Sequence, residues 1–275
     1  MYKREFIGEF IGTFMLVLFG CGSVAVSVLF DAHHGLLQIA AVWGIGVSLA
    51  IYATRHLSCA HLNPAVTLAM VASRRMVARK MPVYLAAQFI GAFTSGLLLY
   101  LLFGPAIASF ENAGGIVRGT AESIQTARIF GEYYIAAGDT GYSFMLAAGA
   151  EAFGTFLLVL MIFSLTEGCN LGRPDDNLAP IFIGLTVTSL ICLLAPLTQA
   201  GLNPARDFGP RMVAWLFGWG QAAFPDHYGG FFFVYMLAPI IGGQVAGLLF
   251  MRILEPLMNT RSDGRCCCGS GLSKK

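Results

Sequence analysis

Leu62-Asn63-Pro64-Ala65 and Leu202-Asn203-Pro204-Ala205 are two copies of one tetrapeptide in a chain of 275 residues. An asparagine before a proline is typical of a helix start, because the asparagine caps the helix and the proline fits its first turn. The apolar segments near 63–72 and 203–217 are too short to cross a bilayer, which needs about 20 apolar residues per helix. We therefore expect two half-helices that begin inside a hydrophobic layer.

Further stretches repeat around the two tetrapeptides. Glu9-Phe10-Ile11-Gly12-Thr13 matches Glu151-Ala152-Phe153-Gly154-Thr155, and Gln88-Phe89-Ile90-Gly91 is matched with Gln244-Val245-Ala246-Gly247. Three matches in the same order predict a duplicated unit of helix, helix, half-helix and helix. Because each unit has three full spans, an odd number, we expect the second unit to be inverted relative to the first.

The composition indicates that lipid surrounds most of the chain. Hydrophobic residues make up 56% and charged residues 12%, and the mean hydropathy is +0.70. A soluble domain carries about 25% charged residues. The net charge of +2 excludes a basic nucleic-acid-binding protein, and the apolar content excludes a disordered chain. We expect no nucleic-acid partner.

Six stretches are long and apolar enough to span a membrane. They lie at roughly 6–30, 36–57, 81–104, 143–166, 178–197 and 231–254. The predicted fold class is an all-α membrane protein with six transmembrane helices and two re-entrant half-helices in an inverted three-helix repeat. Lysine and arginine gather on one side of this arrangement, which predicts that both termini are cytoplasmic.

The spans divide the chain into four parts. We expect a first inverted repeat at 1–104, an extracellular connecting loop at 105–142, a second inverted repeat at 143–255 and a cytoplasmic tail at 256–275. The tail carries Cys266, Cys267 and Cys268, for which S-acylation or soft-metal binding is the alternative to incidental thiols. His33 and His34 are adjacent and could bind a metal, but we expect them to be solvated.

Two acids fall inside the predicted spans. Intramembrane acids often mark proton relays, so Glu9 and Glu151 make a proton-coupled transporter an alternative. A carboxylate can instead accept the N–H groups of a non-helical loop that has no water to bind. We expect this supporting role for Glu9 and Glu151, with Gln88 and Gln244 serving the same loops.

Three stretches carry a resemblance to a known family. They are His61-Leu62-Asn63-Pro64-Ala65-Val66-Thr67, Gly201-Leu202-Asn203-Pro204-Ala205-Arg206-Asp207-Phe208-Gly209-Pro210-Arg211 and Gly115-Ile116-Val117-Arg118-Gly119-Thr120-Ala121-Glu122-Ser123. In them the chain resembles the aquaporin (major intrinsic protein) family, and within it the glycerol facilitators, over roughly 5–255. The resemblance implies a homotetramer in the plasma (cell inner) membrane, with one pore per chain that passes glycerol and water and excludes ions and protons.

The resemblance also implies which residues line the pore. They are Asn63, Asn203, Arg206, Trp43, Ile191 and Ala200. Arg206 is expected at the narrowest point, donating to solute hydroxyls, and a structural ion pair with a carboxylate is the alternative. Ile191 and Ala200 depart from the bacterial glycerol facilitator pattern, which pairs Gly with Phe there. The set of Trp, Ile, Ala and Arg is similar to plant nodulin-type channels. His61 and Asp207 are expected to hold the loops in place.

The sequence carries no nucleotide-binding loop, catalytic serine motif or zinc-ligand spacing. We expect no enzyme activity, no cofactor and no metal. Within the channel class, the alternative to a glycerol channel is a water-selective or a metalloid- or urea-permeable pore. From another class, the alternative is the secondary transporter, whose coupling would need Glu9 or Glu151.

Overall fold

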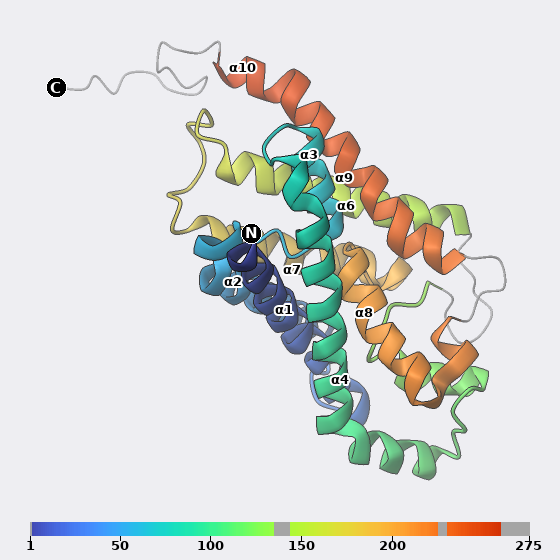
Figure 1. The fold of residues 1–275 in the computed structure, drawn as a ribbon. Coiled ribbons are helices and arrows are strands. Elements are labelled where there is room, and N and C mark those ends of the chain that lie inside the picture. Colours follow the sequence, from blue (N-terminus) through green and yellow to red (C-terminus); the bar gives the residue numbers. More distant parts are fainter. Residues whose placement is uncertain (1, 135–143, 225–229, 260–275) are drawn as a thin grey trace.

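The computed structural model describes residues 2–134, 144–224 and 230–259, which are mainly helical and contain no strand (Figure 1). The long helices are α1 (Lys3–Phe30), α2 (Leu36–Ser58), α4 (Met81–Gly114), α6 (Phe144–Thr166), α7 (Ala179–Thr198) and α9 (Ala238–Leu249). Shorter turns are η1 (Ala78–Lys80), η2 (Ala121–Ser123), α5 (Ile124–Ala127), η3 (Trp215–Trp219), η4 (Gly220–Ala223), η5 (Phe232–Leu237), η6 (Phe250–Leu254) and α10 (Glu255–Asn259). In the described ranges, six helical segments are long and apolar enough to cross a membrane. The expected all-α class is confirmed.

Two half-helices begin at the repeated tetrapeptides. They are α3 (Pro64–Ala72) and α8 (Pro204–Ala214). α3 packs against α9 and α8 packs against α4, so each lies against the last long helix of the other repeat (Figure 1). The two half-helices also contact each other. This exchange joins the two repeats and surrounds both short helices with protein.

The two repeats share one pattern of internal contacts. α1 packs against α2 and α4, and α6 packs in the same way against α7 and α9. A Cβ at Gly12 would lie 2.3 Å from Leu62 Cδ2, and one at Gly154 would lie 2.5 Å from Leu202 Cδ2. The repeated glycine therefore lets the leucine of each loop pack directly onto the first helix of its repeat.

The sequence match of Gln88 with Gln244 is wrong. The Tyr84 hydroxyl donates to the Ser58 carbonyl, and in the second repeat the Tyr235 hydroxyl donates to the Thr198 carbonyl. These contacts make Tyr84 and Tyr235 equivalent, and the equivalent of Gln88, four residues later, is therefore a proline. Gly91 and Gly242, seven residues after these tyrosines, both lie against the backbone of the first helix of their repeat, which supports this alignment.

The third span is longer than expected. α4 continues past the predicted end near 104 to Gly114. Glu111 accepts hydrogen bonds from Arg118 Nε and Thr126 Oγ1, at 2.8 and 2.7 Å. The last turns of α4 therefore pack against the segment that follows, and part of the predicted loop is helical. The predicted end near 104 corresponds to the length that crosses a bilayer, and this criterion does not detect a helix that continues beyond the membrane.

Parts of two predicted segments lie outside the described residues. Within the predicted connecting loop at 105–142, these are residues 135–142. Within the predicted tail at 256–275, they are 260–275, which include the three tail cysteines. The half-helix predicted at 203–217 is shorter in the structure. α8 ends at Ala214, and the backbone at Phe217 and Gly218 is not helical.

Candidate functional site

The two loops before the half-helices share an unusual backbone. Left-handed φ values between 52° and 66° occur at Cys59, Ala60 and Leu62 and, at the matching positions, at Gln199, Ala200 and Leu202. None of these residues is glycine, and side chains seldom adopt this region because it is strained. The surrounding structure must therefore hold each loop firmly, and the duplication has preserved the same conformation twice.

The two buried acids supply that support. Glu9 accepts hydrogen bonds from the backbone N–H groups of His61 and Leu62, at 2.9 and 2.8 Å. Glu151 accepts them from the backbone N–H groups of Gly201 and Leu202, at 2.9 and 2.7 Å. Both glutamates have no exposed surface. Each carboxylate therefore satisfies two loop donors that have no helical partner.

Different side chains complete the two carboxylate sites. Gln88 Nε2 donates to Glu9 at 2.7 Å and to Thr67 Oγ1 at 2.9 Å. His61 Nδ1 lies 3.2 Å from the same threonine oxygen. In the second repeat, Thr198 Oγ1 donates to Glu151 at 2.6 Å. Gln244 does not take part there: its Nε2 is buried and has no hydrogen-bond partner among the described residues.

Asn63 and Asn203 cap their own half-helices and brace the opposite loops. Asn63 Oδ1 accepts from the Ala65 N–H at 2.8 Å, and Asn203 Oδ1 accepts from the Arg206 N–H at 3.2 Å. Asn63 Nδ2 donates to the Leu202 carbonyl and Asn203 Nδ2 to the Leu62 carbonyl, both at 2.8 Å. Because an amide nitrogen has two N–H donors, each asparagine keeps one donor beyond this brace.

Two cavities meet beside these loops. The larger, about 400 Å³, is lined by both asparagines and by Arg206 and Ala200. The smaller, about 350 Å³, is lined by residues that include Glu132 and Gln199. Trp43 and Ile191 line both cavities, so they stand where the two meet. All six predicted lining residues, Asn63, Asn203, Arg206, Trp43, Ile191 and Ala200, thus border one or both of these cavities, and His61 lines the larger cavity as well.

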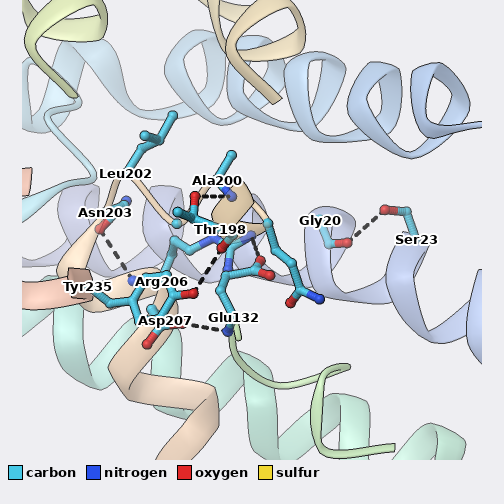
Figure 2. Close-up of polar contacts among 12 residues, drawn as sticks. Gly20, Ser23, Glu132, Thr198, Ala200, Leu202, Asn203, Arg206, Asp207 and Tyr235 are labelled. Atoms are coloured by element: carbon cyan, nitrogen blue, oxygen red, sulfur yellow. Dashed lines mark hydrogen bonds and ion pairs between the residues drawn. The ribbon is translucent and has the colours of Figure 1, made fainter. Parts of the chain in front are cut away.

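Arg206 is the charged group at this junction. Its side chain is 4% exposed, and its guanidinium lies 4.0 Å over the Trp43 ring. Nη2 forms an ion pair with Glu132 Oε1, and Figure 2 shows the two side chains pointing toward each other. Nη1 is buried and has no hydrogen-bond partner among the described residues. Arg206 is therefore paired with Glu132 through Nη2, and its Nη1 is available as a hydrogen-bond donor.

A family model described as "Major intrinsic protein" matches residues 1–250. The chain belongs to the major intrinsic protein family. It is 41% identical over 256 residues to the propanediol uptake facilitator PduF of Citrobacter freundii, covering 92% of each chain. It is 40% identical over 240 residues to the glycerol uptake facilitator protein of Pseudomonas aeruginosa, covering 86% of this chain and 83% of the relative.

A solved structure agrees with this assignment. The aquaglyceroporin from Plasmodium falciparum matches with a TM-score of 0.82 and 26% sequence identity, over 94% of this chain and 100% of that one. This major intrinsic protein is therefore an integral membrane protein with the aquaporin-like arrangement that its repeats predicted.

Sequence reasoning missed Glu132 of this major intrinsic protein. Asp207 Oδ1 accepts the Glu132 N–H at 2.7 Å (Figure 2). Arg211 Nη2 donates to the Glu132 carbonyl. Burial raises the pKa of the Glu132 carboxyl above its ordinary value, and the positive charge of Arg206 opposes this effect. The available signal was Arg206 itself, because a cation inside a membrane usually requires a nearby acid.

Asp207 and Arg211 hold the backbone of Glu132 in place next to Arg206. Arg211 donates to both Asp207 oxygens, from Nε at 3.0 Å and from Nη2 at 2.9 Å. The Arg211 guanidinium also lies over the rings of Phe231 and Tyr133, at 4.5 and 4.7 Å. Asp207 is fully buried and lines neither cavity. It contacts the segment that carries Glu132, in keeping with a residue that supports a loop.

Proposed function

We propose that this major intrinsic protein is a passive channel for small uncharged solutes, glycerol and water above all. The observation that carries the proposal is the junction of the two cavities. At this junction, the apolar side chains of Trp43 and Ile191 lie near the buried Arg206, which has an N–H donor without a partner among the described residues. The glycerol and propanediol facilitators to which the chain is similar support the same substrate class.

A three-carbon polyol suits such a junction because it has one polar and one apolar side. Its hydroxyl groups would accept from Arg206 Nη1 and then from the second N–H of Asn63 and of Asn203. Its carbon backbone would slide along Trp43 and Ile191. Each hydrogen bond to water is thereby exchanged for one to the channel, which keeps the barrier to passage low.

Ion exclusion follows from charge and from the half-helices. α3 and α8 begin at the two asparagines, and a helix N-terminus carries roughly half a positive charge. Together with Arg206 they oppose the passage of cations and protons. The junction offers no full set of ligands to replace the hydration shell of an ion.

Propanediol is a second candidate solute. The specific observation is the apolar side chain of Ile191, which lines both cavities, while Arg206 lines the larger one. A diol with a methyl group presents fewer hydroxyls and more carbon to such a wall. The similarity to a propanediol uptake facilitator supports this candidate as well.

We infer that the channel lies in the bacterial inner membrane with both termini cytoplasmic, and that it forms a homotetramer. The distribution of lysine and arginine supports the orientation. The proton-coupled transporter is the less favoured reading, because both candidate acids are committed to hydrogen bonds with the loops. A water-selective or a urea- or metalloid-permeable pore remains the alternative within the channel class.

Stopped-flow light scattering on proteoliposomes tests the proposal. Vesicles with purified protein should take up glycerol, propanediol and water faster than protein-free vesicles of the same lipid and size. Arginine and sodium salts of the same osmolarity serve as controls and should not enter. Entry of water without entry of glycerol or propanediol would contradict the proposal and indicate a water-selective pore.

A further inference from the structure

Gly20 of α1 lies against the indole ring of Trp43. A Cβ at this glycine would stand 2.1 Å from Trp43 Cε3 and 2.2 Å from Cδ2 and Cζ3. Carbon atoms in ordinary contact are about 3.5–4.0 Å apart, so even one methyl group would overlap the ring by more than 1 Å. Gly20 lines neither cavity, and its nearest contact with a cavity wall is the tryptophan.

The α1 backbone carries an additional hydrogen bond at this point. The Ser23 hydroxyl donates to the Gly20 carbonyl at 2.7 Å (Figure 2). One helical turn of α1 is therefore bonded internally where it meets the indole. At the same interface the roles are exchanged, because a Cβ at Gly46 of α2 would lie 2.7 Å from Phe19 Cβ of α1. In each helix a glycine therefore packs directly against an aromatic residue of the other helix.

α2 cannot move away from α1 to make room. On its far side it meets α7, where a Cβ at Gly44 would lie 2.4 Å from the Gly184 carbonyl oxygen. A Cβ at Gly184 would lie 2.3 Å from the Gly44 carbonyl oxygen. The two backbones are therefore in direct contact one residue from Trp43. A group added at Gly20 has to displace the indole ring, and the free space beside that ring is the two cavities.

We propose that Gly20 is a positioning residue that sets how far Trp43 projects into the passage, and thereby which solutes fit through it. With glycine at this position the indole is seated against the α1 backbone, and the junction admits the cross-section of a three-carbon polyol. A methyl group moves the ring toward Arg206 and Ile191 and leaves room for water alone. The inference rests on the proposed function, since it takes Trp43 as a wall of the solute pathway.

Gly20→Ala, with Gly22→Ala as its matched control, tests the proposal. Gly22 is two residues away on the same helix, but a Cβ there would meet its nearest neighbour, Leu99 Cδ2, at an ordinary 3.6 Å. Glycerol flux should fall about tenfold in Gly20→Ala, which is about 1.4 kcal/mol of barrier, and water flux should fall less than about threefold, which is under about 0.7 kcal/mol. Gly22→Ala should match the parent for both solutes. Rates are taken per folded protein in vesicles.

The compensating variant separates positioning from damage. Gly20→Ala combined with Trp43→Phe has a smaller ring beside the added methyl group and should recover glycerol flux to within about threefold of the parent. Equal losses of water and glycerol in Gly20→Ala, or no recovery in the double variant, would overturn the proposal. A parent that conducts no glycerol would instead refute the proposed function.

A second comparison applies if Gly20→Ala alone does not fold. Trp43→Phe by itself should widen the junction and admit a four-carbon polyol. Adding Gly20→Ala to that background should reduce the flux of the four-carbon polyol again, because the methyl group pushes the smaller ring inward. An unchanged flux of that polyol between these two variants would overturn the proposal.

Discussion

Glu151→Gln separates the loop-supporting role of this acid from a proton relay. Glu151 Oε1 accepts from Gly201 N and Thr198 Oγ1, and Oε2 accepts from Leu202 N. A glutamine has one oxygen and one NH₂ group, so in either orientation its NH₂ faces a backbone N–H. One buried donor is left without an acceptor, and the remaining bonds lose the assistance of the negative charge.

The magnitude follows from these bonds. An unsatisfied buried donor costs about 1–3 kcal/mol, and charge-assisted hydrogen bonds are about twice as strong as neutral ones. We expect Glu151→Gln to lower the free energy of unfolding by about 2–4 kcal/mol. For a chain of this size that corresponds to a fall in Tm of roughly 4–16 °C.

Thermal unfolding in detergent measures this effect, with glycerol flux and its pH profile recorded in parallel. Glu122→Gln is the control, because Glu122 is exposed and its neutralisation should leave the Tm close to that of the parent. A Glu151→Gln variant that keeps the parental Tm and flux but loses a pH response of transport would refute the reasoning. Glu151 would then be a relay acid.

Three further predictions concern the junction. Arg206→Val should keep glycerol flux and raise proton leak in a pH-sensitive dye assay; leak equal to the parent would leave exclusion to the half-helix dipoles alone. Ile191→His with Ala200→Thr should lower glycerol flux about tenfold, or about 1.4 kcal/mol of barrier, and change water flux much less; a parallel fall of both would remove these residues from the selective wall. Glu132→Ala should lower stability by about 3–5 kcal/mol because Arg206 stays buried without its partner, and Arg206→Val should restore much of it in the double variant; additive losses would contradict the pairing.

The fold could be predicted because its signals are duplicated. One Asn-Pro-Ala tripeptide is a weak signal of a helix start. Two of them at matching positions of a repeat with three spans per unit predict two half-helices and six spans. The repeated glutamate of the first helix in each repeat led to the expectation of contacts with the loops, and the structure contains such contacts from Glu9 and Glu151. Apolar spans and helix caps act locally, so a sequence reveals them directly.

The rest of the site depends on contacts that no local pattern encodes. Glu132 lies in an irregular segment without a counterpart in the other repeat, and it reaches Arg206 only through the folded loop. Gln88 was matched with Gln244 by the pattern Gln-x-x-Gly alone, whereas the tyrosine contacts place a proline at the position equivalent to Gln88. The close contact of Gly20 with Trp43 is equally invisible, because both residues look like ordinary members of apolar helices.

Glycerol movement without any ion gradient tests the central claim most directly. Proteoliposomes containing the purified protein would have equal sodium, potassium and pH on both sides and a glycerol gradient across the membrane. Passive conduction predicts net glycerol flow down its gradient, at a rate proportional to that gradient and unchanged by ionophores for protons or sodium. Glycerol uptake that requires an imposed proton or sodium gradient, or that accumulates glycerol against its own gradient, would contradict the account.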